Sequence, residues 1–263
     1  MIIDCFTFYN ELDMLEHRLE YLYDHVDHFV LSECNYTHAG NPKPMYYADN
    51  IDRFAKYKDK IIYTPFIIDP NDYVFEQGKA DGACWELERA QRRNLGNGIK
   101  QFNNDAIIII TDLDEIPNVD IFPRFKQDLK NTPVIRLGQQ LFYYNLRCKT
   151  PILWTYSVVT TKQQVDIHGA DWFRMNAVVP AYLDGGWHLS YFMSAEMIAN
   201  KLANFAHQEY NTPEWKNIER IRDVVTNAKD PYGRVDELPL SLIPRDQFPA
   251  SFLRVFAHFY DNP

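Results

Sequence analysis

The stretch AIIIITDLDEIP, residues 106–117, carries the strongest structural signal in the sequence. It begins with a run of apolar residues, and Ile107 to Ile110 within it are all β-branched. Such a run predicts a central strand that is covered on both faces. The strand leads directly into Asp112 and Asp114, and in open parallel sheets ligands bind beyond the carboxyl ends of the strands. The segment therefore predicts an α/β sheet with a binding site at this strand end.

The residues before this strand alternate between strand and helix patterns. The leucines from Leu12 to Leu22 recur at spacings of three and four, which is one face of an amphipathic helix. A strand, a helix and a strand in succession indicate parallel pairing. In chain order, the pattern predicts strand 2–8, helix 12–26, strand 29–33, helix 51–57, strand 60–63, loop 69–82 and helix 84–95. We expect Gly96 and Gly98 to close the last of these helices.

The second half predicts strands of a mixed sheet, followed by helices. The expected elements are strands 134–137, 141–145 and 152–160, a tight loop at 185–188, helices 195–206 and 214–227, and a tail from residue 230 that is rich in proline and aromatics. No linker or repeat divides the chain. We therefore expect one α/β domain over residues 1–263, in which a central, mostly parallel sheet flanked by helices is followed by a C-terminal helical and aromatic elaboration.

Composition excludes several classes of protein. The chain has 263 residues, of which 24% are charged and 46% hydrophobic, and this is a globular balance. Its 27 Lys and Arg against 36 Asp and Glu give a net charge of −9, which argues against a nucleic-acid partner. No stretch approaches the roughly 20 apolar residues of a membrane span, and the start of the chain does not resemble a signal peptide. We expect a soluble, cytoplasmic protein.

Asp112 and Asp114 are candidate metal ligands, and Glu115 adds a third acid. Two convergent carboxylates repel each other unless a cation lies between them. Hard ions such as Mn²⁺ or Mg²⁺ suit oxygen ligands and can bridge to phosphates. The alternative interpretation is a simple turn that Pro117 ends.

Two enzyme classes use such a pair of acids. One is the nucleotide-sugar glycosyltransferase with a DxD motif, and the other is a phosphohydrolase with Asp112 as nucleophile. The phosphohydrolase motif normally lies on the first strand of its domain and continues with Thr or Val, whereas here Glu115 and Ile116 follow. Both points favour the transferase. A catalytically silent module that binds nucleotide-sugars or glycans is a third possibility.

Several ordered blocks of the sequence resemble family 17 glycosyltransferases. They are DCFTFYNELD (4–13), the segment 33–44 with THAG and KP, WE to QR (85–92), TDLDEIP (111–117), GWHLSY (186–191) and KL (201–202). The resemblance covers about residues 2 to 210, and such a combination is far more specific than DxD alone. It implies a GT-A-like α/β fold and an inverting, metal-dependent transfer, with UDP-GlcNAc as donor and a glycan hydroxyl as acceptor. Residues 1–117 would form the nucleotide-sugar half, and 118–263 the acceptor half.

The resemblance also suggests roles for individual residues. Asp114 would bind the metal directly, and Asp112 would reach the metal or the donor ribose. Glu33 would hold the base or ribose, although it is equally a simple strand end. Arg92 would contact the diphosphate, although Glu88 four residues earlier also fits a surface ion pair.

The C-terminal blocks contribute further candidates. His188 would complete the metal site, and Trp187 beside it offers a face on which a sugar can stack. His207 is a second choice for ligand or diphosphate contact, although it also suits a helix C-terminus. An inverting transfer needs a general base, for which Asp171, Glu209 and Glu115 are the candidates.

Overall fold

Four parallel strands form the N-terminal half of the sheet. The computed structural model describes residues 1–73, 75, 82–176, 179, 181–234 and 239–261. The four strands lie side by side in the order β3 (Ile61–Phe66), β2 (His28–Cys34), β1 (Ile2–Phe8) and β4 (Ile107–Asp112). In chain order, helix α1 (Leu12–Leu22) connects β1 to β2, and helix α3 (Ala83–Ile99) lies between β3 and β4, as the hydrophobic pattern predicted. Most of the expected loop 69–82 lies outside the described residues.

The end of α3 corrects one prediction. Gly96 and Gly98 were expected to close this helix, but α3 continues through both glycines to Ile99. A Cβ atom on Gly98 would lie 2.4 Å from Cγ1 of Val30 and 2.9 Å from Cγ2 of Thr64. Gly98 is therefore the point where the helix approaches the sheet closely, and not a helix terminus.

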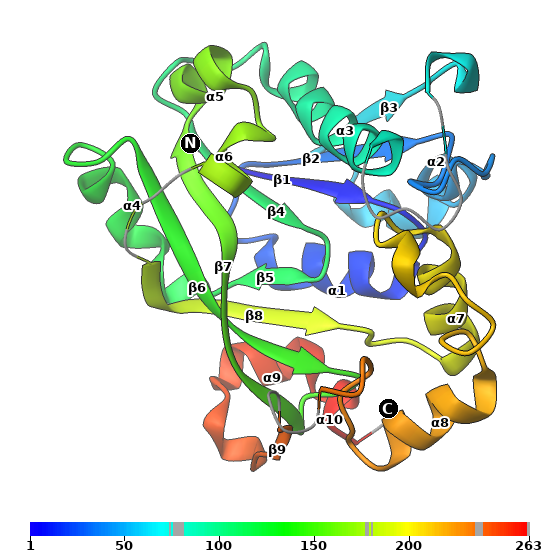
Figure 1. Cartoon of the computed structure of the whole chain (residues 1–263). Helices are drawn as coiled ribbons and strands as arrows, with labels where there is room; N and C mark the ends of the chain where they lie inside the picture. Colours follow the sequence, from blue (N-terminus) through cyan, green and yellow to red (C-terminus); the bar gives the residue numbers. More distant parts are fainter. Residues whose placement is uncertain (74, 76–81, 177–178, 180, 235–238, 262–263) are drawn as a thin grey trace.

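The C-terminal half extends the same sheet with mixed pairing. Strand β4 pairs antiparallel with β7, and the sheet continues through β6 and β8 to β5, with β9 added to β7 (Figure 1). The bounds are β5 (Glu115–Pro117), β6 (Val134–Tyr143), β7 (Cys148–Thr161), β8 (Ala181–Ser190) and β9 (Ser241–Leu242). The two strands expected at 134–137 and 141–145 are one strand, β6, whose register with β7 shifts between Leu137 and Gln139.

The expected tight loop at 185–188 is wrong, because these residues lie within β8. A Cβ atom on Gly185 would lie 2.6 Å from the backbone nitrogen of Gly138 in β6. On Gly186, where φ is +129°, it would lie 2.1 Å from the carbonyl oxygen of Ile116 in β5. The glycine pair thus lets β8 pass closely between two strands, and this contact could not be read from the local sequence.

Helices cover both faces of the sheet and wrap its C-terminal end (Figure 1). The predicted helices 195–206 and 214–227 appear as α7 (Ala195–Asn204) and α8 (Ile218–Thr226). The tail forms α9 (Ala250–Phe256) and α10 (His258–Asp261), and α9 packs against α1. The shorter elements are α2 (Tyr46–Asp49), α4 (Phe122–Asp128), α5 (Lys162–His168), α6 (Trp172–Asn176), η1 (Ile51–Tyr57), η2 (Pro70–Asp72), η3 (Val119–Ile121), η4 (Gln208–Tyr210) and η5 (Arg245–Gln247).

The predicted α/β domain, with a central sheet flanked by helices, is confirmed. Its sheet is parallel over the first four strands and mixed beyond them. Within the residues described, no helix has both the length and the apolar character that crossing a bilayer requires.

Candidate functional site at the carboxyl end of β4

A buried arginine fixes the turn that carries the acids. Arg18 of α1 is fully buried, and its guanidinium forms a two-bond ion pair with Asp4 at 2.6 and 2.8 Å. Its Nη1 also donates to the backbone carbonyls of Asp112, Leu113 and Glu115 at 2.8–3.1 Å. Strand β4 ends at Asp112 and β5 begins at Glu115, so one side chain holds the whole connection between them.

Asp112 lies between two arginines. Its Oδ1 accepts a hydrogen bond from Nη2 of Arg92 in α3 at 2.7 Å, and its Oδ2 accepts one from Nη2 of Arg174 in α6 at 2.5 Å. Burial alone would raise the pKa of Asp112, but Arg174 and Arg92 outweigh it and hold this pKa well below its ordinary value. The side chains of Arg92 and Arg174 are only 3% and 12% exposed, so water competes little with this clamp.

Asp114 meets a different pair of partners. Its Oδ2 lies 3.2 Å from the ammonium of Lys201 in α7, and its Oδ1 lies 3.5 Å from Nε2 of His188 in β8. Burial would raise the pKa of Asp114, but Lys201 and His188 reverse this effect and lower it. Figure 1 shows α3, α6 and α7 arranged around the turn between β4 and β5. Three helices therefore bring one cation each to the acids.

Glu115 is fully buried and saturated with hydrogen bonds. Its oxygens accept from Nε1 of Trp154 and Oγ of Ser157, both at 2.6 Å, and from Arg174 at 2.8 and 3.1 Å. It also accepts from the backbone N–H of Asp112 at 2.9 Å. A general base needs a free lone pair toward the acceptor hydroxyl, and this carboxylate has none to offer. The geometry makes Glu115 a residue that positions Asp112 and Arg174.

His188 lies opposite Glu115 in the register between β5 and β8. Its ring is 8% exposed and packs against Trp154, with ring centroids 4.5 Å apart. Its Nδ1 has no hydrogen-bond partner among the described residues, whereas Nε2 faces Asp114. A buried imidazole with an unpaired nitrogen is an uncommon arrangement in a protein that lacks a use for it.

Two predicted donor contacts lie inside the protein. The carboxylate of Glu33 is fully buried and binds Lys43 at 3.1 Å, the hydroxyl of Tyr63 at 3.0 Å and the backbone of Tyr47. The ring of Trp187 packs on Phe252 of α9, with centroids 4.0 Å apart, on the opposite face of β8 from His188. The structure therefore does not bring Trp187 to the acids, because alternation along β8 turns it into the core.

The remaining candidates, Asp171, Glu209 and His207, lie at the edge of the site. Asp171 forms an ion pair with Arg93 at 2.9 Å, just before α6. Glu209 in η4 binds Nδ1 of His207 at 2.7 Å, and the ring of His207 meets Trp85 edge-on. His207 and Glu209 are both exposed. They pair with each other, and not with Asp112 or Asp114.

Three residues of the site were missed by the sequence reasoning, namely Arg18, Arg174 and Lys201. The sequence does contain a signal for Arg18, because this charged residue falls on the apolar face of α1, between Leu15 and Leu22. A charged residue there must find a buried partner. Arg174 and Lys201 reach the acids from 62 and 87 residues away in sequence, which no local pattern reveals.

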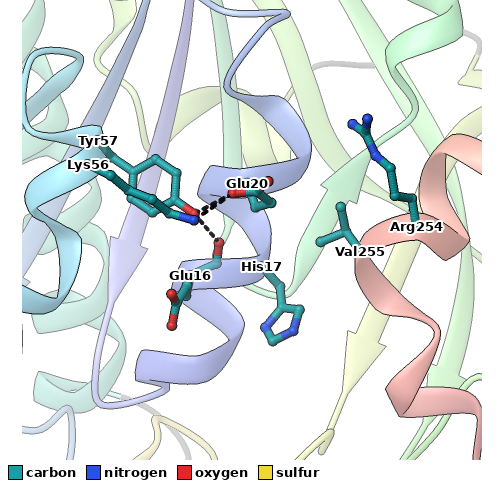
Figure 2. A pocket seen from close by; sticks show the side chains of 7 residues that line it. All are labelled: Glu16, His17, Glu20, Lys56, Tyr57, Arg254 and Val255. Carbon is teal, nitrogen blue, oxygen red and sulfur yellow. Dashed lines mark hydrogen bonds and ion pairs between the residues drawn. The ribbon is translucent and has the colours of Figure 1, made fainter.

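A surface hollow lies elsewhere on the molecule. It has a volume of about 350 Å³ and is lined by α1, η1 and α9, with Glu20, Lys56 and Tyr57 bonded to one another on one wall (Figure 2). Arg18 leaves α1 on the other side, toward the acids. We therefore place the chemistry at the end of β4 and not in this hollow.

Asp114 and His188 fit part of a metal site. Their facing atoms are 3.5 Å apart, close to the separation of neighbouring ligands around a small divalent ion. In the described ranges, no three His, Cys, Asp or Glu side chains form a cluster that could hold a metal. Mg²⁺-type sites often use only one or two protein ligands and complete the shell with substrate phosphates and water. The protein thus offers two ligands, and the substrate would supply others.

The fold and the site define an α/β protein with an acidic centre, ringed by cations, at the end of its parallel strands. The model of glycosyltransferase family 17 matches residues 1–239, and the chain belongs to that family.

Curated relatives and solved structures were also compared. The human and rat β-1,4-mannosyl-glycoprotein 4-β-N-acetylglucosaminyltransferases are each 25% identical over 256 residues, which cover 85% of this chain and 46% of theirs. The chain thus spans about half the length of these relatives. The crystal structure of S. aureus TarS 1-349 aligns with a TM-score of 0.41 at 9% identity, over 86% of this chain and 71% of that one, which is a distant likeness.

Proposed function

We propose that the protein transfers a sugar from a UDP-sugar donor to a glycan hydroxyl, with inversion and with a divalent metal. The observation that carries this proposal is the acidic turn at the end of β4, surrounded by Arg92, Arg174 and Lys201. Acids that can hold a metal, beside cations that can bind phosphate oxygens, suit a nucleoside diphosphate. Membership of glycosyltransferase family 17 directs this chemistry to sugar transfer. The relatives' name favours GlcNAc as the sugar.

The roles follow from the contacts. Asp114 and His188 would hold Mn²⁺ or Mg²⁺, which when bound neutralises charge on the departing diphosphate. Asp112, fixed by Arg92 and Arg174, would orient the donor, and the N–H groups of Arg92 would face the diphosphate. Glu115 would keep Asp112 and Arg174 in place. Trp187, which faces the core, would not contact the donor, and Glu33 would influence donor binding only through Lys43 and Tyr63.

Two carboxylates stay as candidates for the general base. Asp171 precedes α6, whose Arg174 contacts Asp112, and Glu209 follows α7, whose Lys201 contacts Asp114. Each therefore lies on a segment that reaches the acids, from opposite sides. Comparison of Asp171→Asn with Glu209→Gln separates them, since loss of turnover with retained donor binding identifies the base.

The first test is calorimetric titration of the protein with UDP and a panel of UDP-sugars, each with Mn²⁺ and with EDTA. We expect Mn²⁺-dependent UDP binding and one preferred sugar, whose transfer to glycan acceptors is then followed by mass spectrometry. Asp114→Asn should abolish the Mn²⁺ dependence, whereas Asp120→Asn, an exposed acid just beyond the turn, should leave it unchanged. Absence of any nucleotide binding would refute the proposal.

A further inference from the structure

Lys201 occupies the position that a cation would take beside Asp114. It projects from α7, and its ammonium lies 3.2 Å from Oδ2 of Asp114 and 3.5 Å from Oε1 of Glu11. The ammonium also lies 5.7 Å from the ring centroid of Tyr191, which adds a weak cation–π contact. A positive charge therefore already bridges two carboxylates on the metal side of the turn.

The ammonium of Lys201 faces the carboxylates of both Asp114 and Glu11, and its side chain is 21% exposed. A charged ammonium in contact with Asp114 repels any second cation that approaches the same carboxylate. Lys201 and a divalent ion therefore compete for Asp114.

The partners of the two aspartates differ in how easily they can leave. Asp112 is held by two buried arginines, each of which has further bonds, to Glu88 or to Glu115. Asp114 is held by one lysine, whose four-carbon stem is flexible, and by one histidine at a longer distance. Exchange of partners is therefore expected at Asp114 and not at Asp112.

We propose that Lys201 is the resident counter-ion of the metal position, and that it moves from Asp114 to the donor diphosphate when a divalent metal binds. The inference rests on the proposed function, because it takes the diphosphate and the metal from it. It predicts weak metal binding without nucleotide, since the metal must displace Lys201 first. It also predicts that metal and nucleotide strengthen each other's binding, because the released ammonium gains a phosphate partner, and such coupling is reciprocal.

The test removes the ammonium and measures metal binding without any sugar. Lys201→Met and Lys201→Gln are titrated with MnCl₂ in the absence of nucleotide, with free Mn²⁺ followed by electron paramagnetic resonance. We expect both variants to bind Mn²⁺ at least about 10-fold more tightly than the wild type, because the competing charge is gone. In the same variants, saturating Mn²⁺ should strengthen UDP binding about 10-fold less than in the wild type, because the phosphate contact of the released ammonium is lost. Thermal melting checks that each variant is folded.

Lys56→Met is the matched control. It removes the same charge from an exposed lysine–carboxylate pair, Lys56 with Glu20, on the far side of α1 (Figure 2). Mn²⁺ binding by Lys56→Met should equal that of the wild type. If folded Lys201→Gln binds Mn²⁺ no more tightly than Lys56→Met, the counter-ion role is refuted. Tighter Mn²⁺ binding by Lys201→Gln, together with no binding of any nucleotide to the wild type, would uphold the counter-ion role of Lys201 and refute the transferase, so the two proposals fail separately.

Discussion

At the scale of single residues, Arg18 is the side chain on which the site depends most. Its guanidinium joins Asp4 of β1 to three backbone carbonyls of the acidic turn and to Oγ1 of Thr111. All of these groups are buried, so each would be left unsatisfied if the guanidinium were removed. Arg18 thus holds the backbone between β4 and β5 in place, and this backbone carries Asp112 and Asp114.

We predict that Arg18→Met lowers the free energy of unfolding by about 3–5 kcal/mol, because it leaves Asp4 as an uncompensated buried charge. Arg18→Lys should recover only part of this loss, since an ammonium cannot form the planar two-bond pair. Urea denaturation at neutral pH measures both. Arg53→Met, which breaks an exposed pair with Asp13 and Glu16, should cost only about 0–1 kcal/mol. Equal losses in Arg18→Met and Arg53→Met would contradict the anchoring role.

At the scale of elements, the approach of α3 to the sheet positions Arg92. The helix carries Arg92 toward Asp112 and Gln91 toward the backbone of β1 and β2, so its distance from the sheet sets the clamp on the acid. Gly98 allows that distance, because any side chain there would collide with Val30 and Thr64.

Two glycines of α3 provide a matched comparison. Gly98→Ala should destabilise the protein by about 1–3 kcal/mol, because the added methyl group overpacks a buried contact. Gly96→Ala meets no atom within 4 Å and should stabilise the helix by up to about 1 kcal/mol. Urea denaturation of the pair tests this opposite sign. Stabilisation of similar size at both positions would show that helix propensity, and not helix–sheet distance, governs this region.

At the scale of the whole molecule, the C-terminal tail belongs to the main core. The family model ends at residue 239, yet α9 beyond it buries Phe252 against Trp187 of β8 and Tyr21 of α1. Phe252 and Phe256 are fully buried in the same cluster as Phe6 and Leu15. The tail therefore packs against α1, which carries Arg18, and against β8, which carries His188.

We predict that loss of the contact between Phe252 and the core lowers the stability of the whole protein, and that the tail and the sheet unfold in one cooperative transition. We expect Phe252→Ala to cost about 3–5 kcal/mol, because it leaves a cavity between α9, α1 and β8. Leu242→Ala, at a side chain 61% exposed, should change stability by less than about 0.5 kcal/mol. Denaturation followed by both tryptophan fluorescence and circular dichroism measures this. Separate transitions by the two probes would show instead that the tail folds independently of the sheet.

Local pattern predicted much of the fold. The apolar run at 106–110, the helical spacing of the leucines in α1 and the alternation of strand and helix each depend on the few residues beside them. The pair Asp112 and Asp114 was likewise located by its strand. Predictions were wrong at two pairs of glycines. Gly96 and Gly98 were expected to end a helix, and Gly185 and Gly186 to form a loop, but helix and strand continue through them, and Gly98, Gly185 and Gly186 allow close packing.

The α/β class, the parallel first half and the acids at the end of β4 were predictable from local pattern, because hydrophobic periodicity and strand direction are properties of short segments. Tertiary contacts were needed to show which cation meets which acid, that Glu115 is saturated with hydrogen bonds, and that Trp187 faces the core. These contacts join residues 20 to 97 positions apart, from Arg92 with Asp112 to Arg18 with Glu115. Their formation depends on the crossing of strands and on the space between layers, which no local pattern encodes.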